Sequence, residues 1–315
     1  MSATPALPAF SRRPVVARIA SVAQRSPRAA GLVVAVESVG HLVPCSPWSG
    51  RVHSVFARAC NIACGELLLT IGARGTGNGP TTIVLADGAG DLRDRFAVAE
   101  DVHARGGSIR GVRTELVFAN ARVWRAQARA ALCAGATIKA RLHALRQRLE
   151  RTRAARPNVL DRDAAPIARA IGRACSALDL ARATANADRL LGWGEGLTPA
   201  GDDFLVGLLA GLDALGRGDP QRERFRDSLA AAVAARTHAT TPIAAHALRL
   251  AAAGHRAASL DRFVVALCCG DDEREADPAL ESLLAVGATS GADTASGVLV
   301  AVDAWSHAAL LVEAA

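Results

Sequence analysis

The sequence contains no tyrosine, one methionine and one lysine, Lys139, among its 315 residues. Its aromatic residues are seven Phe and four Trp. Proteins that bind single-stranded nucleic acids stack bases on aromatic side chains, so this scarcity counts against that class. The net charge of +7 comes almost wholly from arginine. Because abundant Arg and Ala are typical of a GC-rich coding sequence, we do not take the charge as a sign of a nucleic-acid partner.

Hydrophobic runs long enough to cross a bilayer are also missing. Phe204–Leu212 is ended by Asp213, and Gly297–Val312 is interrupted by Asp303 and His307. The Arg-rich N-terminal segment is not followed by an apolar stretch of signal-peptide length, although a transit peptide has a similar composition. We therefore expect a soluble, cytoplasmic protein with no membrane partner, and keep a transit peptide as the minor alternative for that segment.

Several motifs of metal and nucleophile chemistry are absent. The seven cysteines form no C-x-x-C pair, which argues against a zinc knuckle and a thioredoxin-like redox site. No H-E-x-x-H zinc motif and no G-x-S-x-G nucleophile elbow occurs. An odd number of cysteines in a chain of this length favours reduced, buried thiols, which fits a cytoplasmic protein.

The first part of the chain carries a strand pattern. Half of the residues are hydrophobic, so a sizeable core is expected. Short runs rich in Val, Ile and Leu alternate with Gly- and Pro-rich turns over residues 14–120, after a flexible segment 1–13. No long helical pattern separates them, so the pattern predicts a barrel or sandwich rather than parallel βαβ units. The predicted strands are Val15–Ala23, Gly31–Val43, Val52–Cys60, Leu67–Gly72, Thr82–Ala86 and Thr114–Ala119.

The pattern becomes helical near residue 121. Leu142, Leu145 and Leu149 recur at helical spacing within residues 121–153, where Pro is absent. The dense basic run of residues 141–156 is expected to be a solvated helix face. The sequence thus predicts an α+β protein, with a β-rich domain over residues 14–120 and an all-α domain over residues 121–315. Further helices are predicted at Ala165–Thr184, Pro199–Leu215, Gln221–Ala235, Pro242–Ala253, Ala279–Val286 and Thr294–Leu311.

The segment that most strongly indicates chemistry is a glycine-rich loop that leads into a helix. Gly194 and Gly196 permit tightly turned backbone, and Thr198 is predicted as the N-cap before Pro199 at the first helical position. Together with Gly201, this loop would present free N–H groups at the positive end of a helix dipole. Such a junction is suited to binding phosphate or carboxylate.

Asp202 and Asp203 follow directly, and negative charge there would repel a phosphate. Three roles are open: holding a metal that bridges to the anion, accepting hydrogen bonds from a substrate nitrogen, or tying down the loop. Consecutive helical residues point about 100° apart, so the two carboxylates need not share one role. We predict both as catalytic residues.

A second helix start repeats the pattern Gly-x-Asp-x-x-x-Gly-x-Leu. Ser290, Gly291 and Asp293 occupy it, with Ser290 and Asp293 spaced as in a capping box. Thr240 and Thr241 stand before another helix start and offer hydroxyl groups. We predict that all five residues bind substrate. We also predict that the helices near Pro199 and Asp293 begin at one common cleft.

The motif at residues 194–203 resembles the signature G-x-G-L-T-P-S-G-D-D of the AllH-like family. The likeness extends to Val52–Asn61, to Thr240–Ile243 with Leu248 and Gly254, and to Thr289–Asp293 with Gly297. This chain has Ala200 where the family has Ser, and Ala244 where a Ser is common. Those two hydroxyl groups therefore have no role here.

The resemblance implies a link to an oxamate carbamoyltransferase of allantoin breakdown, a multi-subunit enzyme. We therefore expect an enzyme or enzyme subunit that binds a small anionic substrate, with partner subunits and no resident cofactor. One alternative is a non-catalytic, anion-binding or regulatory subunit. Another is a Mg²⁺-dependent enzyme that uses Asp202, Asp203 and Asp293.

Overall fold

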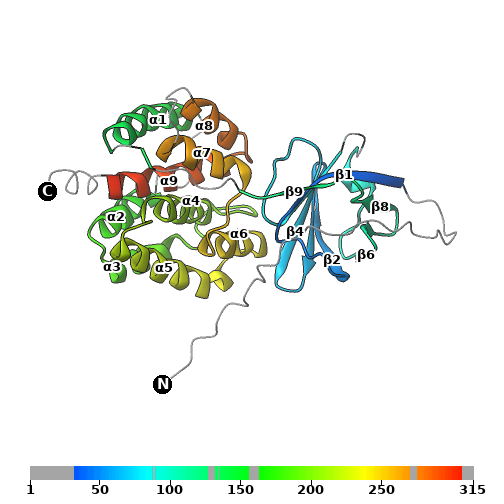
Figure 1. The fold of residues 1–315 in the computed structure, drawn as a ribbon. Coiled ribbons are helices and arrows are strands. Elements are labelled where there is room, and N and C mark those ends of the chain that lie inside the picture. Colours follow the sequence, from blue (N-terminus) through cyan, green and yellow to red (C-terminus); the bar gives the residue numbers. More distant parts are fainter. Residues whose placement is uncertain are drawn as a thin grey trace, which may run out of the picture.

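The computed structural model describes residues 32–86, 88, 90–126, 132–133, 135–155, 163–269 and 275–306. The segment 1–13 and the predicted strand Val15–Ala23 lie outside these ranges. Within them, a strand-rich part is followed by a helical part (Figure 1). The α+β prediction is therefore confirmed.

The strands of the described residues form one sheet that closes on itself. Their order is β5-β4-β3-β2-β6-β7-β8-β1-β9, and an additional β1–β5 pairing joins eight of them into a barrel. Buried side chains from alternating positions, such as Val34, Ile62, Leu69 and Leu116, fill its interior. The strands are β1 (Leu32–Gly40), β2 (Trp48–Val55), β3 (Ala59–Cys64), β4 (Leu67–Gly72), β5 (Thr82–Leu85), β6 (Asp101–Arg105), β7 (Ser108–Arg110), β8 (Thr114–Val117) and β9 (Arg122–Trp124).

Three strand predictions are corrected by this sheet. The predicted strand Val52–Cys60 is two strands, because the chain turns at 56–58 and the Phe56 N–H donates to the carbonyl of Ala59. The β6–β7 hairpin was not predicted, although Gly106 and Gly107, both with positive φ, form its two-residue turn. β9 lies where a helix was expected, since it pairs in parallel with the end of β1.

After β9, the regular elements of the described chain are helices and the short 3₁₀ turn η3 (Thr237–Ala239), while a similar turn, η1 (Leu92–Asp94), lies between β5 and β6. The predicted helix Ala165–Thr184 is two helices, because Leu178 adopts a φ of 53° and Asp179 caps the second one. Helix α7 was not predicted, and no side chain caps its start. The helices are α1 (Gly135–Ala155), α2 (Ala165–Ser176), α3 (Leu180–Leu190), α4 (Ala200–Leu215), α5 (Pro220–Ala235), α6 (Pro242–Ala252), α7 (Ala258–Cys268), α8 (Ala276–Leu284) and α9 (Ser290–Ser306).

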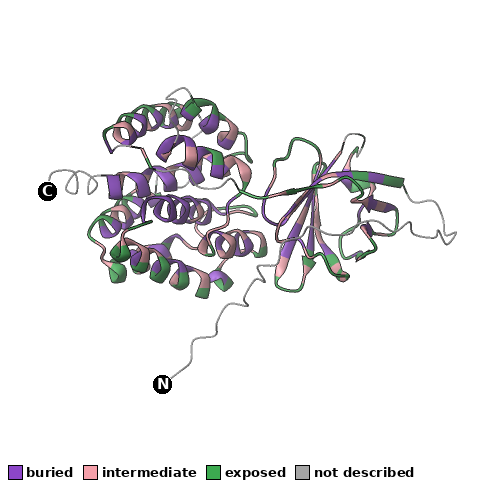
Figure 2. Ribbon diagram, in the orientation of Figure 1, coloured by how far each residue is buried: buried purple, intermediate pink, exposed green. Residues whose placement is uncertain are grey.

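Helix α4 runs through the centre of the helical part and is buried along almost its whole length (Figure 2). It packs against α9 at two glycines. A Cβ atom on Gly207 would overlap the carbonyl oxygen of Thr294, and one on Gly297 would overlap that of Phe204. The absence of side chains at these two positions lets the helix backbones touch.

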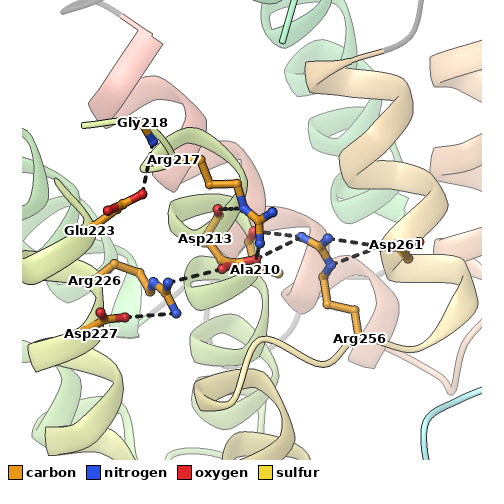
Figure 3. A network of polar contacts seen from close by, with 9 residues as sticks. All are labelled: Ala210, Asp213, Arg217, Gly218, Glu223, Arg226, Asp227, Arg256 and Asp261. Carbon is orange, nitrogen blue, oxygen red and sulfur yellow. Dashed lines mark hydrogen bonds and ion pairs between the residues drawn. The ribbon is translucent and has the colours of Figure 1, made fainter. Parts of the chain in front are cut away.

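A buried ionic network fixes the other end of α4 (Figure 3). Asp213 is 4% exposed and lies within 3.5–3.7 Å of guanidinium nitrogens of Arg217, Arg226 and Arg256. Arg256 in turn pairs with Asp261 at 3.0 Å. Because every charge in this network faces an opposite charge, we assign it to structure.

The barrel and the helical part are joined by direct contacts through α6 and α7. The buried imidazole of His246 on α6 accepts from the Leu68 N–H at Nδ1 and lies 3.1 Å from the Thr81 hydroxyl at Nε2. The Ala258 N–H donates to the carbonyl of Asn78 at 2.9 Å. Burial lowers the pKa of His246 to about 4, so the imidazole is neutral. No helix among the described residues is both apolar enough and long enough to span a membrane.

Candidate functional site

The glycine-rich loop reaches α4 with left-handed backbone at three positions. Gly192, Gly194 and Gly196 have φ values of 69°, 111° and 91°, a region that side chains disfavour. The helix begins one residue later than predicted, because Pro199 rather than Thr198 is its N-cap. The Thr198 hydroxyl makes no capping bond at this helix start. It is directed to the start of another helix instead.

That other helix is α9. Thr198 Oγ1 lies 2.9 Å from Ser290 Oγ, and this hydrogen bond joins residues 92 positions apart in the sequence. The helix starts at Ser290, and the Asp293 N–H donates to the carbonyl of Thr289. The predicted capping box at Ser290 is therefore wrong. The starts of α4 and α9 lie side by side, with their hydroxyl groups in contact.

Two glycine amides predicted to hold an anion are already hydrogen bonded. The Gly201 N–H donates to the carbonyl of Trp193 at 2.9 Å, and the Gly291 N–H donates to that of Val286 at 3.0 Å. The space beside each is filled by backbone, because a Cβ on Gly201 would overlap the Leu190 carbonyl. These glycines therefore permit close packing at the two helix starts.

Asp202 holds the loop in place. It is 1% exposed, and its Oδ1 accepts from the Gly192 N–H at 3.0 Å while its Oδ2 accepts from the Thr240 hydroxyl. Burial raises the pKa of Asp202, and these two bonds lower it. Thr241 adds a second tie, since its hydroxyl donates to the carbonyl of Leu197 at 2.5 Å. In this geometry Asp202 and Thr240 act on the loop, which is one of the three roles left open by the sequence.

Asp203 is the other carboxyl group of the pair and is differently placed. It is 9% exposed, and its Oδ2 has no hydrogen-bond partner among the described residues. Its pKa is raised to about 8, mainly by burial and also by the negative charges of Asp293 and Asp202, although hydrogen bonds from Ser290 and Thr198 lower it. Asp203 is therefore mostly protonated near neutral pH.

Asp293 occupies the equivalent step of α9 and is fully buried. Its Oδ1 lies 2.5 Å from Nη2 of Arg153, which also bonds Ser296 through Nη1. Sequence analysis missed Arg153, because it expected the basic run on α1 to face solvent. Other arginines of that run also pair with acidic residues, Arg146 with Asp303 and Arg148 with Asp277 and Glu281. The scarcity of acidic residues within the run was the available signal, since its charges had to find partners elsewhere.

The magnesium hypothesis required Asp202, Asp203 and Asp293 to act together. Asp202 is occupied by Gly192 and Thr240, and Asp293 is paired with Arg153. In the part of the chain that the structure covers, no three His, Cys, Asp or Glu side chains gather in a group that could hold a metal ion. The geometry therefore does not provide the ligand set that this alternative needs.

Fold and site together define a class of protein: a β-barrel joined to a helical bundle in which two helices begin side by side around a buried acid. The chain belongs to the AllH family. The model of the AllH family N-terminal domain matches residues 33–123, and that of oxamate carbamoyltransferase subunit AllH matches residues 190–302. The second match contains both helix starts. No solved structure matches the chain.

Proposed function

We propose that the chain is a substrate-binding subunit of an oxamate carbamoyltransferase, and that the starts of α4 and α9 hold its small anionic substrate. Oxamate and carbamoyl phosphate are the candidate ligands. The observation that carries the proposal is the contact between Thr198 and Ser290, which brings two helix N-termini together. Each terminus carries about half a unit of positive charge, and two at one place reinforce each other on an anion.

The charges around these helix starts favour the proposal. From sequence alone, two carboxylates beside an anion would repel it. In the structure, burial keeps Asp203 mostly protonated, and Arg153 offsets the charge of Asp293. The rotatable hydroxyl groups of Thr198 and Ser290 remain as donors that can turn toward a ligand.

This arrangement suits the transfer of a carbamoyl group. When that group passes between phosphate and the oxamate nitrogen, negative charge develops on the oxygens at the reacting centre. Donors fixed in advance stabilise such charge without a covalent nucleophile. Asp203 would contact the substrate, whereas Asp202 would keep the loop in position. The remaining catalytic groups would come from partner subunits.

A thermal-shift series on the full chain tests the binding step. Oxamate, carbamoyl phosphate, phosphate and chloride are compared at matched ionic strength. A ligand at a hundred times its dissociation constant stabilises the fold by about 2.7 kcal/mol, which is a readily measured shift. We expect oxamate or carbamoyl phosphate to give this shift and chloride to give none.

Two variants test where on the protein the ligand binds. The double variant Thr198→Val with Ser290→Ala removes both hydroxyl groups and should abolish the shift. Thr76→Val is the matched control, because the Thr76 hydroxyl donates to the carbonyl of Ala73 in the loop between β4 and β5 of the barrel. Equal shifts in all three proteins would place the ligand elsewhere. Activity assays of the chain alone and with its partner subunits then separate a catalytic subunit from a non-catalytic, anion-binding one.

A further inference from the structure

The unpartnered oxygen of Asp203 is unusual for a protein interior. Leaving a buried polar atom without a hydrogen bond costs about 1–3 kcal/mol, so folded proteins contain few such atoms. This oxygen lies where the starts of α4 and α9 meet, because the hydroxyl groups of Thr198 and Ser290 contact each other and both hydrogen bond to Asp203. An unmet polar atom at two paired helix starts points to a missing ligand.

The surroundings of Asp203 determine what its oxygen can do. The carboxyl groups of Asp202, on its own helix, and Asp293, on α9, both disfavour a negative charge there. The cation at the neighbouring start, Arg153, is engaged with Asp293 and Ser296. The other groups that face Asp203 are the neutral hydroxyls of Ser290 and Thr198. The carboxylate charges of Asp202 and Asp293 thus favour the protonated form of Asp203, and Arg153, the cation that would oppose them, is paired with Asp293.

A protonated carboxyl group presents one O–H donor in addition to its acceptor sites. The unmet oxygen of Asp203 therefore requires an acceptor, and the complementary ligand group is a carbonyl or carboxylate oxygen. Cations and amines offer only donors and do not satisfy it.

We propose that Asp203 is a protonated acid whose Oδ2 donates a hydrogen bond to a carbonyl or carboxylate oxygen of the ligand, and so selects small acids such as oxamate. This inference rests on the proposed function, because it places the ligand at the starts of α4 and α9. Oδ2 is shielded from solvent, so the ligand reaches it when the 194–198 loop moves outward. The Cβ direction of Gly196 is open, and Leu197 is 49% exposed, so the outer side of this loop is not packed against the fold.

Calorimetric titration of the full chain with oxamate tests the assignment. Oxamate is the suitable probe because it does not titrate over the range compared, from about pH 7 to about pH 9.5. Three proteins are compared: wild type, Asp203→Asn, which keeps a neutral donor, and Asp203→Leu, which has a similar shape and no donor. Asp227→Asn is the matched control, because Asp227 is exposed on α5.

We expect wild type and the D227N control to lose about tenfold in affinity for each pH unit above the pKa of Asp203. D203N should bind within about threefold of wild type at neutral pH and should not weaken at high pH. D203L should lose at least about tenfold at both values. If D203L does not fold, the comparison of D203N with wild type still decides.

The contrary results are distinguishable. If wild type binds oxamate equally at both pH values and D203N does not bind, the carboxylate is the required form, and this inference is wrong while the proposed function stands. If wild type binds carbamoyl phosphate in the thermal-shift series but not oxamate, the inference is wrong while the proposed function stands. If it binds neither, the proposed function is wrong and the inference falls with it.

Discussion

The starts of α4 and α9 share one local sequence pattern, and they differ in the groups that face their aspartates. Each places an aspartate two residues after a packed glycine, and each has a second glycine four residues later where the two helices touch. Asp293 faces Arg153, whereas Asp203 faces hydroxyl groups and other carboxyl groups. The same residue type in the same backbone setting thus becomes a structural ion in one helix and a mostly protonated acid in the other. The groups that face each aspartate lie outside the shared motif, and they determine which role the aspartate takes.

Removing the cation that pairs with Asp293 should have the largest effect on stability. Arg153→Met leaves the Asp293 charge buried without its counter-ion, and breaking a buried ion pair costs about 3–5 kcal/mol. Urea unfolding measures this loss. Adding Asp293→Asn in the same chain should recover part of it, because the uncompensated charge is removed. A single variant as stable as wild type would show that Arg153 does not neutralise Asp293.

Neutralising the two aspartates should give opposite results. A folded-state pKa of about 8, against 3.8 for the free group, means that Asp203 favours folding fully below pH 3.8 and loses this contribution as pH rises toward 8. Asp203→Asn should therefore gain stability relative to wild type over that range, by up to about 1.4 kcal/mol for each pH unit. Asp293→Asn should lose stability at every pH. Parallel melting curves for D203N and wild type across this range would contradict the assignment.

The contact between the helices can be tested at its glycines. Gly297→Ala places a methyl group against the Phe204 carbonyl, and overpacking of this kind costs about 1–3 kcal/mol. Gly172→Ala is the control, because its methyl group meets only a side-chain methyl of Val300. Thermal unfolding should show a clear loss for the first and a small change for the second. If Gly297→Ala changes stability as little as Gly172→Ala does, α4 and α9 can separate at no cost.

Replacing His246, at the interface between the barrel and the helical part, should have the smallest effect on stability. Its dependence on pH should be opposite to that of Asp203. The pKa of His246 is lowered to about 4 from 6.5, so its contribution to stability is present above pH 6.5 and declines as pH falls. Arg249 also disfavours the charged form. His246→Asn keeps an acceptor for the Leu68 N–H and does not titrate. We expect wild type to lose about 1 kcal/mol relative to this variant over the first pH unit below 6.5.

The sequence predicted those parts of the fold whose signals are local. Leu67–Gly72 and the end of α4 at Leu215 agree with the structure. A short apolar run between glycine-containing turns marks the strand, and Gly216 follows the helix directly. β9 was missed because three residues become a strand only through their pairing with β1. The turn at Leu178 depends on a backbone conformation that its side chain does not signal.

The sequence predicted most residues of the candidate site, but it did not predict how their charges are paired. The glycine loop and both aspartates could be identified from spacing, and repetition of the motif suggested that the two helix starts meet. Arg153 lies 140 positions before Asp293, and no local pattern connects them. The N-cap assignments for Thr198 and Ser290 were wrong, because their hydroxyl groups bond each other across the two helices.

A crystal structure of the chain with oxamate would test the central claim most directly. The account predicts an oxamate oxygen within about 3 Å of Asp203 Oδ2, between the starts of α4 and α9, with the Thr198–Ser290 contact opened or shared by the ligand. Oxamate bound elsewhere, with Asp203 Oδ2 still unpartnered, would contradict it.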